Sequence, residues 1–207
     1  RDELSSILDL QSMKIIELGS TRGVYEHEPL DKINNNDFCC LVLPEGFLSE
    51  CNFLFEFSLK CAKEYPNIKF IWRLHPAVSF SDVLRKNNNL SSLPDNIILS
   101  KSSLEQDIRH SKWVLYRGST AVFKALSYGL RPFYLPNNNE ISIDPLFNFN
   151  EFKYIVKEPA VLNSLIQNDI KTNFIDHTKF LAVSKDHCNN QFSSFSLKTL
   201  EFILNKS

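Results

Sequence analysis

The sequence predicts an α/β fold in which a parallel β-sheet carries helices on both faces. Five short apolar runs alternate with segments of about ten to fifteen residues that show helical spacing. The runs are rich in Ile, Leu, Val and Phe at successive positions, which is typical of strands buried on both faces. Strands that alternate with helices form right-handed crossovers, so neighbouring strands are expected to be parallel.

Each predicted strand ends at residues typical of turns or helix starts. In chain order the strands cover residues 38–43, 68–74, 96–100, 112–116 and 132–135. Three runs of three asparagines, at 34–36, 87–89 and 137–139, all fall in predicted loops.

The helices are predicted from spacing and from capping residues. Side chains at a spacing of four predict a helix over 49–65 that Pro66 ends. Ser81 is expected to cap a short helix, and residues 102–105 match a capping box at the start of a helix that runs to about residue 110. A further helix is expected over 120–128, with Gly129 as its stop.

The flanking segments are expected to be organised differently from this central domain, residues 38–159. Residues 1–10 have helical spacing, residues 14–18 look like a strand, and the polar stretch 21–37 is predicted to be a linker. Residues 160–207 are predicted to form C-terminal helices, with helical patterns at 160–168 and 191–205.

Composition narrows the class of protein. Apolar residues make up 43% of the 207 residues and the net charge is −1, which predicts a globular protein with no overall attraction for nucleic acid. No stretch approaches the roughly 20 apolar residues that a membrane-spanning helix needs. The five cysteines show no metal-binding spacing, so we expect reduced, partly buried thiols in a cytoplasmic protein. They are Cys39, Cys40, Cys51, Cys61 and Cys188.

Ser119 and Thr120 are the strongest candidate site residues. Ligands of open parallel sheets bind beyond the carboxyl ends of the strands, and a Gly-Ser-Thr turn after a buried strand offers hydroxyls, amides and a helix start to a phosphate. Arg117 and Gly118 are expected to join this phosphate site. The alternative is that Ser119 only caps the helix.

His75 and Pro76 follow the second strand and form the next candidate. The imidazole could donate a hydrogen bond to a phosphate oxygen or protonate a leaving phosphate, so His75 is the candidate catalytic residue. Arg73 is two positions earlier, and strand alternation predicts that its side chain leaves the same face as His75. The alternative is a histidine with only a structural role.

Other residues at the strand ends could contact a bound ligand, although simpler explanations exist for each of them. Glu45 and Gly46 could lie near a sugar or form an ordinary turn, and the two serines after Lys101 could be helix caps. Glu140 and Asp144 could bind sugar hydroxyls or lie in a solvated acidic loop. The residues of this group that are expected to contact the ligand are Glu45, Gly46, Lys101, Ser102 and Glu140.

The sequence lacks the short motifs of several other enzyme classes. No dinucleotide fingerprint, P-loop, zinc-binding pattern or Gly-x-Ser-x-Gly elbow occurs in it. We therefore expect neither a metal nor a tightly bound cofactor.

Five motifs between residues 38 and 136 together resemble the C-terminal domain of bacterial GT-B glycosyltransferases. They are Leu43-Pro44-Glu45-Gly46, Trp72-Arg73-Leu74-His75-Pro76, Ser103-Leu104 with Asp107-Ile108, Tyr116-Arg117-Gly118-Ser119-Thr120-Ala121, and Ala125-Leu126-Ser127-Tyr128-Gly129-Leu130-Arg131-Pro132. The likeness is to surface-carbohydrate and capsule biosynthesis enzymes, which include CMP-sialic acid and CMP-Kdo transferases. In these enzymes a His-Pro motif and a Ser motif bind the nucleotide phosphate.

The resemblance implies a Rossmann-like donor-binding half that takes part in metal-independent transfer of a sugar from a nucleotide, CMP being favoured. The acceptor would be a surface glycan or a lipid-linked glycan, reached at the inner face of the membrane. Residues 1–20 would then be the remnant of an N-terminal domain that supplies the general base. A sugar-nucleotide epimerase and a non-catalytic carbohydrate-assembly module are the alternatives.

Overall fold

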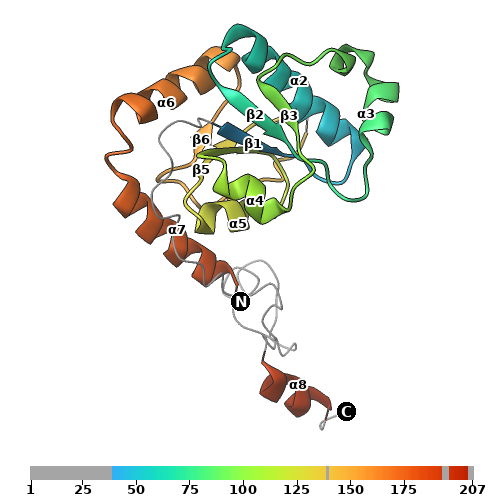
Figure 1. Cartoon of the computed structure of the whole chain (residues 1–207). Helices are drawn as coiled ribbons and strands as arrows, with labels where there is room; N and C mark the ends of the chain where they lie inside the picture. Colours follow the sequence, from blue (N-terminus) through green and yellow to red (C-terminus); the bar gives the residue numbers. More distant parts are fainter. Residues whose placement is uncertain (1–38, 139, 193–195, 205–207) are drawn as a thin grey trace. The chain divides into compact units, whose positions relative to one another are not determined.

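A computed structural model describes residues 39–138, 140–192 and 196–204 (Figure 1). The predicted N-terminal remnant, the linker over 21–37 and the first residue of the first predicted strand lie outside the described residues. The described chain up to Lys185 belongs to one compact unit, and the residues from Asp186 onward belong to another.

The sheet has six strands in the order β3-β2-β1-β4-β5-β6, and every neighbouring pair is parallel. The strands are β1 (Cys39–Leu43), β2 (Lys69–Trp72), β3 (Ile97–Leu99), β4 (Trp113–Tyr116), β5 (Arg131–Tyr134) and β6 (Tyr154–Ile155). This confirms the predicted Rossmann-like parallel sheet, in which the chain crosses over at β1 and then continues on the other side. The carboxyl ends of β2, β1 and β4 are therefore neighbours.

Helices lie on both faces of the sheet, as predicted (Figure 1). They are α2 (Leu48–Glu64), α3 (Phe80–Lys86), α4 (Leu104–Arg109), α5 (Val122–Ser127) and α6 (Pro159–Lys171), with a short 3-10 turn η1 (Asn88–Ser91) after α3. Helix α2 packs on β1 and β2 and also contacts α3 and α6, whereas α5 packs on β4 and β5. Beyond this core, α7 (His177–Gln191) spans the boundary between the two units and α8 (Leu197–Leu204) lies in the second.

The central strands are buried on both faces because every position carries an apolar side chain. All five residues of β1 are buried. On the α2 face the ring of Trp72 stacks on Phe55, with centroids 4.3 Å apart. On the opposite face Leu41 and Val114 are fully inaccessible to solvent. This two-sided burial fixes the sheet and so fixes which loops share its carboxyl edge.

The structure differs from the sequence prediction in details of capping and in two elements. The cap of α3 is Ser79 rather than Ser81. The capping box at α4 is formed by Ser103 and Gln106, one residue later than the predicted one. Strand β6 and helix α7 were not predicted, because a two-residue strand and a polar helix carry little hydrophobic periodicity.

Candidate functional site

Loops that follow β1, β2 and β4 touch one another at the carboxyl edge of the sheet. A Cβ atom on Gly46, which follows β1, would lie 2.9 Å from Nδ1 of His75, which follows β2. A Cβ atom on Gly118, which follows β4, would lie 2.6 Å from the carboxyl carbon of Glu45. Both positions are glycine because a neighbouring side chain occupies the space of a Cβ. Four predicted site residues are thus brought together.

His75 is exposed at this edge, and a backbone contact fixes its tautomer. Its Nδ1 accepts a hydrogen bond from the amide of Ala77, at 3.2 Å. A neutral imidazole that accepts at Nδ1 carries its proton on Nε2. The ring therefore offers an N–H donor at Nε2.

The turn formed by Gly118, Ser119 and Thr120 precedes α5. The N-cap residue of α5 is Ala121, which makes no side-chain cap. Ser119 acts through its backbone, because its carbonyl accepts the amide of Val122 at 3.2 Å. The alternative that the Ser119 hydroxyl caps the helix is therefore wrong. Helix α5 has only six residues, so its dipole is weaker than that of the predicted helix.

Arg117 lies in the interior instead of facing a ligand. Its side chain is 1% exposed and forms ion pairs with Glu50 and, at 2.6 Å, with Glu140. Its guanidinium also lies over the ring of Phe53, at 5.9 Å from the centroid. Direct phosphate contact was expected for Arg117, and the structure instead gives the guanidinium two carboxylate partners. Glu140, an expected donor contact, is 54% exposed and is held by this arginine.

Glu50 is a carboxylate of this site that the sequence analysis missed. It lies in the first turn of α2, where acidic residues are common, and this position was the only available signal. Burial raises the pKa of Glu50, Arg117 acts in the opposite direction, and the charges of Glu45 and Glu140 raise it further. Two carboxylates thus pair with one buried arginine, and the charge of a third, Glu45, acts on Glu50.

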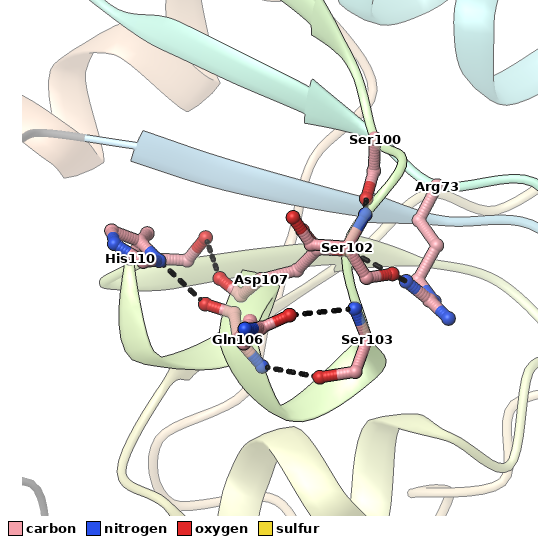
Figure 2. Close-up of polar contacts among 8 residues, drawn as sticks. Arg73, Ser100, Ser102, Ser103, Gln106, Asp107 and His110 are labelled. Atoms are coloured by element: carbon pink, nitrogen blue, oxygen red, sulfur yellow. Dashed lines mark hydrogen bonds and ion pairs between the residues drawn. The ribbon is translucent and has the colours of Figure 1, made fainter.

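The guanidinium of Arg73 is held by the loop that follows β3 and by α4 (Figure 2). Its Nη1 donates to Oδ2 of Asp107 and to the carbonyl of Ser102, each at 2.7 Å. His75 instead lies against Gly46 on the β1 side. Strand β2 ends at Trp72, so strand alternation does not by itself fix the directions of these two side chains, and their shared face stays a prediction. Ser102 contributes its carbonyl to this contact, and Lys101 is exposed beside it.

Asp144 is buried, which overturns the solvated-loop explanation for this residue. Its carboxylate accepts hydrogen bonds from the Tyr116 hydroxyl at 2.9 Å and from the Lys153 ammonium at 2.7 Å. Lys153 also donates to the carbonyl of Leu146, at 2.7 Å. This network fixes the loop between β5 and β6, and its partners lie too far apart in the sequence to be recognised from it.

The described residues include no group of three or more His, Cys, Asp or Glu side chains arranged to hold a metal ion. None of the five cysteines forms a disulfide, and all five are buried, more completely than the partial burial that the sequence predicted. No helix among the described residues is both long enough and apolar enough to span a membrane.

Comparisons with known proteins agree on the fold. No protein-family model matches the chain, and no curated protein matches its sequence. Among solved structures, that of TarM matches with a TM-score of 0.63 and 15% identity, over 99% of this chain and 41% of TarM. The glycosyltransferase SnogD from Streptomyces nogalater matches with a TM-score of 0.53 and 11% identity, over 89% of this chain and 48% of SnogD. The spinosyn rhamnosyltransferase SpnG in complex with thymidine diphosphate matches with a TM-score of 0.51 and 17% identity, over 80% of this chain and 45% of SpnG.

These likenesses show that the chain has a Rossmann-like α/β fold of the GT-B type. The chain spans less than half the length of each of these three structures. At this level of identity the comparisons establish the fold alone.

Proposed function

We propose that this chain forms the donor-nucleotide-binding part of a glycosyltransferase that transfers a sugar from a nucleotide-activated donor to a glycan or lipid-linked acceptor. The observation that carries the proposal is the juxtaposition of His75 with the turn at Gly118 and Ser119, through Glu45 and Gly46. Ligands of open parallel sheets bind at this edge. The fold supports the proposal, since SpnG and S. aureus TarM have been solved in complexes with thymidine diphosphate and UDP, respectively.

In this proposal the chain binds the phosphate of the sugar nucleotide through hydrogen-bond donors from the loops after β2 and β4. Nε2 of His75 donates to a phosphate oxygen, and the Ser119 hydroxyl and the amides of the turn donate from the β4 side. Thr120 belongs to the same turn, and Pro76 fixes the chain after the histidine. As the bond from the sugar to the phosphate breaks, these groups stabilise the negative charge that develops on the leaving nucleotide. No metal is required for this stabilisation.

The donor and acceptor are finer parts of the proposal. The His-Pro and Ser motifs favour a CMP-linked sugar, whereas the solved structures named above hold UDP and thymidine diphosphate. In this proposal Glu45 and the half-exposed Glu140 accept hydrogen bonds from sugar hydroxyls, and Lys101 contacts the nucleotide. We place the reaction in the cytoplasm, with peripheral association at the inner membrane face where lipid-linked acceptors occur. The general base would come from a part of the protein outside this chain.

Titration calorimetry of the full chain against CMP, UDP, GDP and ADP tests the nucleotide site. We expect one nucleotide to bind and His75→Ala and Ser119→Ala to weaken it by about tenfold each, because each loses a hydrogen bond to a charged group. Gln167→Ala and Ser164→Ala, at two exposed positions on α6, serve as controls and should bind like the parent. If no nucleotide binds, or if all four variants bind equally, the site assignment is wrong.

A sugar-nucleotide epimerase is the second candidate, because Glu45, Glu50 and Glu140 place three carboxylates near the same edge. Such carboxylates could act as the acid and base of an epimerisation. Incubation of the complete protein with a sugar nucleotide alone separates the two functions. An epimerase changes the sugar without an acceptor, and a glycosyltransferase does not. If the chain binds nucleotide but the complete protein converts no sugar nucleotide, with or without an acceptor, the protein would instead be a non-catalytic carbohydrate-assembly module.

A further inference from the structure

We propose that Asp107 is a positioning residue, which holds Arg73 so that this arginine serves as the phosphate-binding cation of the site. This inference rests on the proposed function and adds to it the identity of the arginine and the residue that orients it. Asp107 lies on α4, and its residue is 5% exposed. It therefore acts through Arg73 and does not itself contact the ligand.

The carboxylate of Asp107 joins the loops that follow β2 and β3. Its Oδ2 accepts hydrogen bonds from Nη1 of Arg73 at 2.7 Å and from the hydroxyl of Ser100 at 2.6 Å (Figure 2). Ser100 in turn accepts the amide of Ser102, at 3.2 Å. The carbonyl of Ser102 then accepts from the same Nη1 of Arg73. Arg73 is thus anchored at one nitrogen by two acceptors that belong to one closed network.

The start of α4 leaves little else in this loop to bind an anion. Ser103 accepts the amide of Gln106 at 3.2 Å, and the side chain of Gln106 accepts the amide of Ser103 at 3.0 Å. This capping box uses the donors that a helix start would otherwise offer to a phosphate. The cations of Arg73 and the exposed Lys101 are therefore the main positive groups on this side of the edge.

A comparison of the two arginines near the strand ends selects Arg73. The Arg117 side chain is 1% exposed, and separate nitrogens are held by Glu50 and Glu140. The Arg73 side chain is 24% exposed, and both of its recorded acceptors use Nη1. Its Nε and Nη2 groups therefore keep N–H donors for a ligand. Anchoring one nitrogen restricts the rotamers of a long side chain, so less conformational entropy is lost when phosphate binds.

Substitution of Asp107 by Asn tests the role without removing the packing of the helix. The variant keeps the side-chain size, the capping box and the hydrogen bond that the Asp107 carbonyl accepts from the Ser111 hydroxyl at 2.8 Å. It removes the charge that holds Arg73. Glu105→Gln is the matched control, since Glu105 is a carboxylate on the same helix that pairs with the exposed Arg109. Urea unfolding would check that both variants remain folded.

The measurement is the gain in affinity that phosphate adds. It is the affinity for the nucleotide that the parent binds, among CMP, UDP, GDP and ADP, divided by the affinity for the corresponding nucleoside. We expect Asp107→Asn and Arg73→Gln each to reduce this ratio by about tenfold or more, with nucleoside affinity unchanged. The double variant should lose no more than Arg73→Gln alone, because Asp107 acts through Arg73. Asp107→Glu should restore part of the ratio, and Glu105→Gln should keep all of it.

Two outcomes overturn the inference in distinguishable ways. If the parent binds nucleotide and Asp107→Asn keeps the full ratio, or loses nucleoside and nucleotide affinity equally, the positioning role is wrong and the proposed function stands. If the parent chain binds none of CMP, UDP, GDP and ADP, the proposed function fails and the role of Asp107 fails with it.

Discussion

Two buried arginines, one at each edge of the sheet, have nearly the same surroundings and different consequences. Arg117 follows β4 at the carboxyl edge and pairs with Glu50 and Glu140. Arg131 begins β5 at the amino edge and pairs with Asp176 and, at 3.0 Å, with Asp169. The guanidinium of Arg117 also lies over one aromatic ring, and that of Arg131 lies over two. Each arginine therefore has one buried and one partly exposed acidic partner.

The cluster at the amino edge joins the sheet to the helices that follow it. Asp169 on α6 also accepts a hydrogen bond from the indole of Trp113, at 2.8 Å. The guanidinium of Arg131 lies 5.4 Å from the ring centroid of Phe174 and 5.5 Å from that of Phe180. All of these partners belong to the core or to its helices, so the cluster is structural.

At the carboxyl edge the same arrangement supports a candidate site. Arg117 is followed directly by Gly118 and Ser119, and its partner Glu140 lies in the loop after β5. Because both arginines are paired with carboxylates, an arginine at a strand end is not in itself a phosphate ligand. What distinguishes the carboxyl edge is the exposed His75 and the turn at Gly118 and Ser119 that follows the arginine.

The largest effect is expected at the amino edge, from Arg131→Met. Removing one partner of a buried ion pair leaves Asp169 as an uncompensated buried charge, which should lower the free energy of unfolding by about 3–5 kcal/mol. Urea unfolding measures this loss. Arg109→Met, at an exposed ion pair of α4, should barely change the midpoint. A small loss for Arg131→Met would show that this cluster does not stabilise the fold.

The next largest effect is expected from Arg117→Met at the carboxyl edge. At neutral pH the loss should be about 3 kcal/mol, because Glu50 is left buried without its cation. The pKa of Glu50 is already raised by burial, and it should rise further without Arg117. A carboxyl with a raised folded-state pKa destabilises the fold less as the pH falls, so the loss should shrink toward about pH 5. Urea unfolding at both pH values checks this, and a loss independent of pH would contradict it.

A smaller effect, on binding alone, is expected from Gly46→Ala. The added Cβ would lie 2.9 Å from Nδ1 of His75, so the ring must move. We expect about a fivefold to tenfold loss of nucleotide affinity with little change in the urea midpoint, since the ring is at the surface. Calorimetry in the His75→Ala background provides the control, because Gly46→Ala should have no further effect there. An equal loss in both backgrounds would mean that the glycine acts on something other than His75.

The smallest effect is a pH dependence at the amino edge, opposite in direction to that of Glu50 at the carboxyl edge. Burial, and then the charge of Arg131, lower the pKa of His177. The folded state therefore binds its proton less readily than the unfolded state, whose pKa is about 6.5. The contribution of His177 to stability is present above that value and is lost as the pH falls through the lowered pKa. Urea midpoints should fall from about pH 7.5 to about pH 5.5 in the parent and fall less in His177→Phe; parallel curves would contradict this.

Much of the fold follows from local patterns in the sequence. The runs that became β1, β2 and β4 are apolar at nearly every position, and only a sheet covered on both faces buries all of those side chains. Gly129 was predicted to stop α5 and has a φ of +89°, which glycine adopts without strain. Strand β6 escaped prediction because it has two residues and is paired only through β5.

The candidate site divides in the same way between sequence and tertiary structure. The sequence by itself determined that His75, Gly46 and Ser119 lie at one edge, because each follows a predicted parallel strand and such strands end together. Only the tertiary structure decided how the charges pair. Arg117 and Glu50 are 67 positions apart, and Arg73 and Asp107 are 34 positions apart. Hydrophobic periodicity is a local property and carries no record of such distant partners, so the buried arginine and the anchored one became distinguishable only once the helices had packed on the sheet.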